Sequence, residues 1–522
     1  MAERPQPLTL GIAAGFISAA AVPVLILVTG AMVFRFAEFE RGLTGADWAA
    51  IRFTIWQAIL SAIFSVALAI PVARALARRR FPGRRYLIAV MGAPFILPTI
   101  VAIFGLLAIF GRNGVVNQGL VALGFEPVSI YGLTGVVMAH VFFNLPLATR
   151  LLLQGWLDIP AERFRLAASL RLSPGAVFRH FEVPMLWRVA PGALLIVFVI
   201  STTSFAVALT LGGGPRATTV ELAIYQAVRF EFDLARAALL SFVQLAITGS
   251  AAALALGLIR ETRFGAGQDR TLVRWDAAAR QGRGADSVAI FLAGLFLIAP
   301  LLAVVLAGLP TILTLPDVVW IATVRSLAVA LASTVMVLVL VLAMAHAATH
   351  WPGASRPIES AALLAIAASP LVLGMGLFLI LFPFVNPERL ALPVTAMVNA
   401  LVTLPFALRA ILPAYRSAEE DFGRLAATLR LTGWARMRLV ILPRLKRPLG
   451  FSAGVAAALS MGDLGVIALF ADPETATLPL QIFRLMGAFR MDDAAGAALL
   501  LMLVSFGLFW MFDRGGRVDA GS

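Results

Sequence analysis

Long apolar runs constrain the fold of this chain more than any other feature. A helix needs ~20 apolar residues to cross ~30 Å of hydrocarbon, and twelve runs in the 522-residue sequence meet this requirement. They lie at about 8–34, 53–76, 86–110, 132–154, 190–211, 237–259, 287–309, 318–345, 358–384, 391–414, 449–470 and 495–512. Because 60% of the residues are hydrophobic and only 13% are charged, a water-soluble fold could not bury the apolar surface. The sequence therefore predicts an all-α integral membrane protein, and it excludes a soluble enzyme, a secreted disulfide scaffold and a disordered chain.

The net charge of +14 would suggest a nucleic-acid partner in a soluble protein, but in a membrane protein it indicates orientation. Cytoplasmic loops collect Lys and Arg. If the N-terminus is cytoplasmic, the loops after spans two, four, six and ten are arginine-rich, and 31 of the 42 Lys and Arg residues lie on the cytoplasmic side. The outer segments carry acids instead: Glu38, Glu40, Asp47, Glu221, Glu231, Asp233, Asp472, Glu474, Asp492 and Asp493. We therefore expect a multi-pass membrane protein with both termini in the cytoplasm, lipid around it and no nucleic-acid partner.

The chain contains an internal duplication. RLAASLRL at 165–172 recurs as RLAATLRL at 424–431, an offset of 259 residues, and 161–184 matches 420–443 at 10 of 24 positions without a gap. A repeat of this kind predicts two homologous halves. Since each half has an even number of spans, we expect both to have the same orientation, related by an axis along the membrane normal.

The duplication divides the chain into three parts. The first six-span half is residues 1–259, the second is 287–522, and the polar stretch 260–286 is the cytoplasmic linker between them. An alternative for the first apolar run is a cleaved signal peptide, but cleavage would remove one span from the set. We therefore expect the first run to be a membrane span.

The repeated segments, at about 158–188 and 415–447, lie between spans four and five of each half, and we expect two short helices in each. Predicted helix starts are Asp158 with Pro160 and Ser173 with Pro174 in the first copy, and Ser417 with Glu420, then Thr432, in the second. Small side chains would let a partner protein approach closely, and arginines could pair with its carboxylates. The candidate contact residues are Arg165, Ala167, Ala168, Arg171, Pro184, Arg424, Ala426, Ala427, Arg430 and Pro443. Ordinary interfacial amphipathic helices are the alternative.

These segments resemble the EAA loop of ABC importer permease subunits, E-A-A-x(3)-G-x(9)-I-x-L-P. Aligned on the closing prolines, the motif's acid falls on Arg165 and Arg424, and its glycine on Arg171 and Arg430. In that family the loop is a coupling helix that docks into the ATPase subunit. The resemblance therefore implies that each segment binds one copy of a separate ATPase.

Two longer stretches, 203–238 and 460–470, resemble permeases of thiamine and thiamine pyrophosphate importers, which are also fused two-half chains. This resemblance implies a type I ABC importer permease fold in the bacterial inner membrane and a periplasmic binding protein that delivers thiamine or its phosphates. It also implies transport by alternating access. Permeases for ferric iron share the fused architecture and are the main alternative. A more distant one is an ion-coupled secondary transporter with six plus six spans.

The sequence does not contain a catalytic or nucleotide-binding motif of its own. The phosphate-binding pattern GxxxxGK[ST] requires a lysine before Ser or Thr, but the one lysine, Lys446, precedes Arg447. We therefore expect ATP and Mg²⁺ on the partner ATPase and no cofactor on this chain. The chain has no cysteine and no evident Ser–His–Asp or paired-carboxylate arrangement, which disfavours a membrane-embedded enzyme.

Polar residues within the spans are candidates for the substrate path. An ionisable group at membrane depth usually faces the bundle interior, and Asp463 lies in the penultimate span. The alternatives are that Asp463 caps a helix break or pairs with a cation such as Arg325. Ser460, Ser201 and Ser204 are weaker candidates, because such hydroxyls often bond back to the backbone.

Two further sets of residues in the spans carry structural expectations. His346 and His350 have the i, i+4 spacing of a metal site but no evident third ligand, so we interpret them as interfacial residues and predict no metal. Pro94, Pro98 and Pro370 lie inside predicted spans and should kink helices near the central seam.

Overall fold

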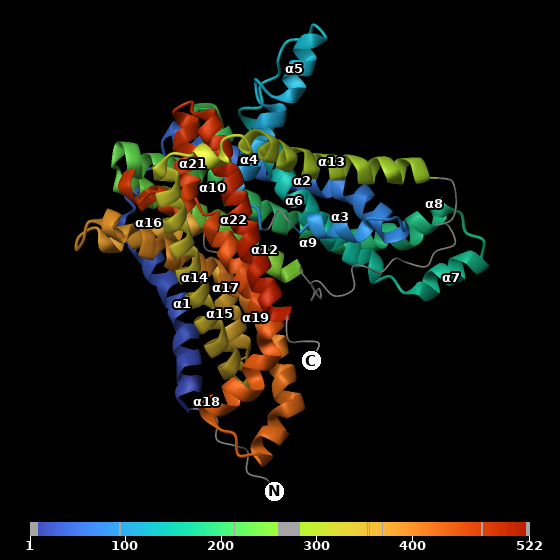
Figure 1. Cartoon of the computed structure of the whole chain (residues 1–522), viewed down its shortest axis with the longest axis vertical. Helices are drawn as coiled ribbons and strands as arrows, with labels where there is room; N and C mark the ends of the chain where they lie inside the picture. The colour runs from blue at the N-terminus through green and yellow to red at the C-terminus, as the bar shows by residue number, and fades with distance from the viewer. Residues whose placement is uncertain are drawn as a thin grey trace.

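The computed structural model describes residues 9–92, 96–212, 214–258, 282–351, 353, 355–367, 369–470 and 473–517. The described residues form helices, turns and loops and no strand (Figure 1). Among them, eleven helical stretches are long and apolar enough to cross a membrane, and Pro370–Leu381 is a shorter apolar helix. The predicted all-α membrane fold is confirmed.

The first half contains twelve α-helices and four short 3₁₀ or π turns among the described residues. These are α1 Thr9–Phe36, η1 Phe39–Arg41, α2 Gly45–Arg78, α3 Arg84–Val90, α4 Thr99–Phe110, α5 Val115–Ala122, α6 Leu133–Leu157, α7 Ala161–Ser169, α8 Pro174–Val177, η3 Phe178–Glu182, α9 Val183–Thr202, α10 Phe205–Leu211, η4 Pro215–Ala217, α11 Val220–Gln226, η5 Ala227–Glu231 and α12 Leu234–Leu258.

The second half begins with a helix that starts slightly earlier than predicted, at Arg283; residues 260–281 of the predicted linker lie outside the described residues. Its elements are α13 Arg283–Gly308, η7 Ile312–Thr314, α14 Asp317–His350, α15 Ser355–Ala367, α16 Pro370–Leu381, η9 Pro387–Leu390, α17 Ala391–Thr428, α18 Gly433–Arg436, η10 Met437–Ile441, α19 Leu442–Met461, α20 Gly465–Phe470, η11 Pro473–Thr475, α21 Leu478–Gly487 and α22 Met491–Arg517.

The prolines expected to kink two spans instead begin new helices. Pro98 is the N-cap of α4, and Pro370 lies in the first turn of α16 after the N-cap Ser369. A proline has no N–H to donate, so it fits the first turn, where that donor would have no intrahelical acceptor. Pro94 lies outside the described residues. The predicted spans 86–110 and 358–384 are therefore helix pairs.

The fifth span of each half is also interrupted. In the first half α9 ends at Thr202 and α10 begins at Phe205, and in the second α19 ends at Met461 and α20 begins at Gly465. Neither break contains a proline. Each half therefore places two helix breaks in what the sequence presents as continuous apolar runs.

The helices of the two halves follow the same order, apart from one insertion, and some pairs have equal lengths. Both α2 and α14 have 34 residues and both α9 and α19 have 20. The first pair begins 272 residues apart, at Gly45 and Asp317, and the second pair 259 apart, at Val183 and Leu442. The difference arises from α5 and its flanking loops, which have no equivalent in the second half and project from the bundle at the top of Figure 1.

Each half packs its first helix against the other half. The N-terminal α1 contacts α14, α15 and α16, whereas α13 contacts α2 and α4. Glycines allow the close crossings: a Cβ on Gly15 would collide with the carbonyl of Ala343, and one on Gly105 with the carbonyl of Pro300. Small residues serve helix packing in lipid in this way. The two halves are thus interlocked around one central seam.

Candidate coupling segments and transport pathway

Both repeated segments contain the same backbone turn. In the first copy, α7 ends with hydrogen bonds from the N–H of Leu172 to Ala167 O (3.0 Å) and from Arg171 N to Ala168 O (3.1 Å). This is the Schellman pattern, which requires a left-handed residue after the helix. That residue is Arg171, with φ of 49°.

The second copy repeats the turn residue by residue. Leu431 N donates to Ala426 O (2.9 Å), and Arg430 has φ of 51°. These two arginines stand where the ABC permease loop has its glycine, and they adopt the conformation for which glycine is usually needed. The departure from the motif in sequence is therefore not a departure in backbone geometry.

The chain enters the two turns differently. In the first half α6 ends at its C-cap Asp158, and α7 starts after the N-cap Pro160. In the second half α17 runs unbroken for 38 residues from the membrane span to Thr428. The helix start predicted at Ser417 and Glu420 is therefore wrong, because Glu419 stands at the position of Pro160 and nothing interrupts the helix.

The other predicted helix starts have mixed outcomes. The predicted cap at Ser173 is confirmed, since its hydroxyl accepts from Ala176 N at 3.2 Å. Thr432 is the N-cap of α18 but makes no side-chain cap bond. Asp158 follows α6 rather than beginning α7 as a cap, and its carboxylate accepts from Gln154 at 2.9 Å.

The side chains that each segment exposes differ from those predicted. The predicted alanines are covered, and larger side chains are exposed in their place. Ala167 and Ala426 are buried against their own half, and Ala168 and Ala427 are half-buried. The residues that protrude are leucines: Leu166 and Leu425 are 56% and 55% exposed, and Leu170 and Leu429 are both 61% exposed. These four were missed by the sequence analysis, although their equivalence in the repeat was visible.

The charged and proline candidates lie around these leucines. Arg165, Arg171, Arg424 and Arg430 are all exposed, and Arg165 pairs with Glu162 of the same helix at 2.7 Å. Pro184 and Pro443 lie in the first turns of α9 and α19, where the segments re-enter the bundle. In Figure 1, α7 and α8 lie at the right and α18 at the bottom, both remote from α10, α16 and α21.

In the first half, an ion pair attaches the segment to the membrane helices. Arg74 near the end of α2 bonds to the carboxylate of Glu182 at 2.6 Å, and Glu182 is fully buried. The Arg74 guanidinium also lies 4.8 Å from the centre of the Phe178 ring. One turn further along α2, Arg78 pairs with Asp286 of α13 at 2.5 Å. The segment, α2 and the start of the second half are thus joined.

In the second half, a histidine cluster occupies the equivalent place. His346 and His350 stand at the same positions of α14 as Arg74 and Arg78 in α2, counted from Gly45 and Asp317. His346 Nδ1 lies 2.7 Å from the hydroxyl of Tyr415, and His350 Nε2 lies 3.4 Å from the carboxylate of Glu419. Arg436 of α18 pairs with the same carboxylate. Glu419 therefore joins the coupling segment to α14.

The candidate path residues all lie at the breaks of the fifth spans. Ser201 accepts from Asn144 at 3.3 Å and Ser460 accepts from Asn399 at 3.0 Å; these serines are equivalent in the repeat and buried. Ser204 is the N-cap residue of α10 without a side-chain cap bond. Each break therefore has one serine–asparagine contact, made by equivalent serines but by asparagines at non-equivalent positions of the repeat.

Asp463 caps the break before α20. Its carboxylate accepts from the backbone N–H groups of Gly465, Val466 and Ile467 and from the side chain of Asn399. Its second oxygen is buried without a hydrogen-bond partner. Of the two structural alternatives stated for Asp463, the contacts correspond to capping of a helix break rather than to pairing with Arg325.

A second buried carboxylate at the seam was missed. Glu221 in the first turn of α11 is 1% exposed and accepts from the hydroxyl of Ser369, in the second half, at 2.5 Å. It also accepts from the backbone N–H of Phe205. Burial raises the pKa of the Glu221 carboxyl to about 7, against the opposing effect of these two hydrogen bonds. The sequence placed Glu221 among the acids of outer loops because nothing local shows that α11 folds back into the seam.

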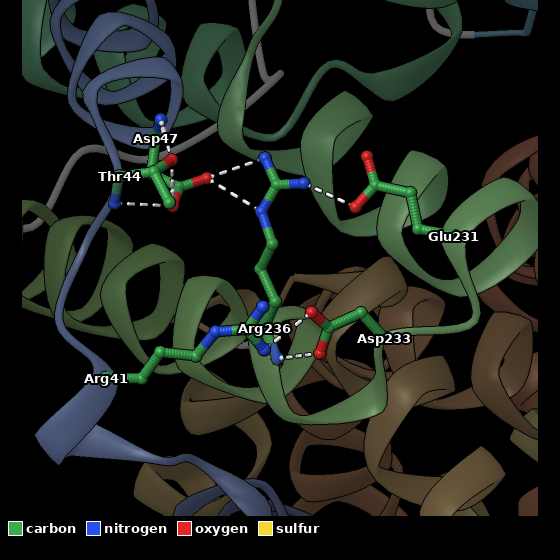
Figure 2. Close-up of polar contacts among 6 residues, drawn as sticks. All are labelled: Arg41, Thr44, Asp47, Glu231, Asp233 and Arg236. Atoms are coloured by element: carbon green, nitrogen blue, oxygen red, sulfur yellow. Dashed lines mark hydrogen bonds and ion pairs between the residues drawn. The ribbon is translucent and has the colours of Figure 1, made fainter.

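A cluster of charged residues connects the α1–α2 loop and α2 with the start of α12 (Figure 2). Arg236 of α12 bonds to Asp47 of α2 at 2.8 Å and to Glu231 at 2.5 Å. Arg41, in the loop before α2, pairs with Asp233 at 2.7 Å. The three acids are among those expected in outer segments, and in the fold they fix the α1–α2 loop to the start of α12.

Comparison with known proteins gives relatives that match almost the whole chain. The chain is 38% identical over 521 residues to the thiamine transport system permease protein ThiP of Brucella abortus (strain 2308), covering 98% of this chain and 95% of the relative. It is 38% identical over 535 residues to ThiP of Escherichia coli (strain K12), covering 98% of each. With ThiP of Haemophilus influenzae the identity is 34% over 476 residues, or 88% of this chain and 87% of the relative. No family model matches the chain.

Proposed function

We infer the function of this chain from its family, since the chain belongs to the thiamine transport system permeases. It is the membrane-spanning permease of a thiamine ABC transporter. We propose that it carries thiamine or its phosphates into the cytoplasm by alternating access. The observation that carries this proposal is the identity of 38% along nearly the full chain, supported by two coupling segments with one shared turn geometry.

Two copies of a separate ABC ATPase would bind the two coupling segments. Each segment offers two exposed leucines, Leu166 and Leu170 or Leu425 and Leu429, surrounded by exposed arginines. Apolar anchors within a charged rim are typical of protein interfaces. Closure of the ATPase pair would move the two segments and rock the halves about their seam.

The energy would come entirely from that partner. The sequence lacks the lysine-containing phosphate-binding pattern, so ATP and Mg²⁺ would be bound by the ATPase and no cofactor by this chain. A periplasmic binding protein would deliver the substrate on the opposite face. In this orientation both termini and both coupling segments are cytoplasmic, in agreement with the distribution of arginines.

A reconstituted complex tests the docking proposal. Leu166→Glu combined with Leu425→Glu should abolish co-purification of the ATPase and ATP-dependent thiamine uptake, because charge replaces both apolar anchors. Leu123→Glu is the matched control, since Leu123 after α5 is 75% exposed and far from both segments. Unchanged ATPase binding in the double variant would contradict the proposal.

Substrate identity is tested separately. Thiamine-loaded binding protein should stimulate ATP hydrolysis by the wild-type complex, whereas ferric iron should not. The relatives reported above are all thiamine permeases by name, so the ferric iron alternative is not favoured. Stimulation by iron and not by thiamine would reverse this conclusion.

A further inference from the structure

We propose that the seam around Phe205 is a transient binding site for a flat aromatic monocation, with Glu221 and Asp463 providing its negative charge. The inference rests on the proposed function, because thiamine carries a permanently charged ring. It extends that function by naming where the permease itself contacts the substrate during passage.

Glu221 lies where the two halves meet. Its carboxylate belongs to α11 of the first half and accepts from Ser369, the N-cap of α16 in the second half. Any motion that separates the halves must stretch this hydrogen bond. The carboxylate would then be released toward the opening seam at the stage when the substrate passes.

Phe205 connects the two carboxylates. Its backbone N–H donates to Glu221, and its ring lies beside Gly465, the first residue of α20 after the break that Asp463 caps. A Cβ built on Gly465 would lie 3.8 Å from the ring carbon Cδ1 of Phe205 and 3.8 Å from Oδ1 of Asp463. The Phe205 ring and Oδ1 of Asp463 therefore border the same position, beside the α-carbon of Gly465, from opposite sides of the seam.

Aromatic rings line the same place. The rings of Phe205 and Tyr225 are 5.2 Å apart at 63°, and that of Phe230 lies 5.7 Å from Tyr225. The face of an aromatic ring attracts an organic cation, and does so more strongly away from water. Rings and carboxylates together match the chemistry of a flat cation better than that of an anion or a sugar.

Neither carboxylate is neutralised by a cation of the described residues. The contacts of Glu221 are with Ser369 and Phe205, and those of Asp463 are with backbone N–H groups and Asn399. One oxygen of Asp463 is buried without a hydrogen-bond partner. Since a buried ionisable group without a counter-ion is costly, a passing cation would be favoured here.

The closed packing of these residues explains why the site would be transient. Glu221, Phe205 and Ser369 are all buried, and Glu221 is hydrogen-bonded to the other two, so a cation would enter only after the halves separate. When they close again, Ser369 would compete for the carboxylate and help to release the cation. Weak binding of this kind suits a transporter, which must also let its substrate leave.

Substrate charge provides the test. In the complex reconstituted with its ATPase and binding protein, uptake of thiamine would be compared with that of deazathiamine, an analogue whose five-membered ring is neutral. Glu221→Gln removes the charge and keeps one amide oxygen that can accept a hydrogen bond from Ser369 or Phe205. We expect it to lower the uptake of thiamine relative to deazathiamine at least about tenfold, equivalent to ~1.4 kcal/mol. Glu126→Gln, a change at an exposed carboxylate in the loop after α5, should leave the ratio unchanged.

Two further variants make the outcome decisive. Glu221→Asp retains the charge and should retain the preference for thiamine, and Asp463→Asn, which can still cap α20, should weaken it. An unchanged substrate ratio in both Glu221→Gln and Asp463→Asn would overturn the inference. A wild-type complex that imports neither compound would instead contradict the proposed function.

Discussion

The two coupling segments contain the same turn, but the helices that lead into it and the contacts that hold it differ between the two halves. In the first half Pro160 separates α7 from the membrane helix α6, and the ion pair between Arg74 and Glu182 attaches the segment to α2. In the second half α17 continues without a break, and Glu419 at the position of Pro160 joins His350 and Arg436.

The difference shows which part of the repeat is constrained. The left-handed turns at Arg171 and Arg430 agree within 2° in φ (49° and 51°), while the residues that attach them have diverged completely. A surface that must fit the same partner twice would keep its shape, and its attachments could change as long as each holds the segment. We therefore expect the second segment to move rigidly with its span and the first to pivot at Pro160.

The largest expected effect comes from giving the second segment the proline that the first segment has at the same position of the repeat. Glu419→Pro should destabilise the protein by about 3 kcal/mol or more, because a proline inside a helix removes a hydrogen bond and clashes with the preceding turn. The change would be measured as the shift in thermal unfolding of the purified permease. Glu419→Ala removes the same ion pairs but keeps the helix continuous, so Glu419→Pro should cost about 3 kcal/mol more than Glu419→Ala. An equal loss in both variants would show that α17 does not need to be continuous.

A smaller effect is expected from the first-half attachment. Arg74→Gln should cost about 2 kcal/mol, since the fully buried carboxylate of Glu182 loses a charged hydrogen-bond donor. Adding Glu182→Gln should recover part of this loss, because the double variant has no buried charge left at the pair. The measurement is a double-mutant cycle on unfolding. Additive losses would mean that the pair does not hold the segment.

The smallest effect concerns the shared turn. Arg171→Gly and Arg430→Gly should each be neutral or stabilising, by up to about 1 kcal/mol, because a non-glycine residue is strained at positive φ. The two halves should respond alike if the turns are equivalent. Stabilisation in one half and clear destabilisation in the other would show that one of the arginines has an additional structural role.

Several features of the fold followed from the sequence because they are encoded locally or by repetition. The apolar runs predicted the membrane helices. The offset of 259 residues predicted two equivalent segments, and both contain the same turn. The cap at Ser173 is a local signal and is present. The signal at Ser417 and Glu420 is also local, but the uninterrupted helix propensity of the surrounding residues prevailed over it.

The seam could not be predicted, because its residues meet only through tertiary folding. Glu221 and Ser369 are 148 residues apart, and although Ser369 with Pro370 is a local helix-start pattern like Ser173 with Pro174, nothing local links it with Glu221. The break between α9 and α10 contains no proline that would mark it in the sequence. It is recognised only in the fold, where α10 packs against α4 and α11. The exposed leucines were hidden for a different reason: apolar residues are unremarkable in so apolar a sequence, and only burial distinguishes those that protrude.

The location of the two exposed leucines of α7 and α17 tests the central claim most directly. The chain has no cysteine, so Leu166→Cys and Leu425→Cys each introduce one unique thiol. In the complex with the ATPase, both thiols should react with membrane-impermeant reagents only from the cytoplasmic face and should cross-link to the ATPase. Reaction of the two thiols from opposite faces, or cross-linking of neither, would contradict the account of two equivalent docking segments.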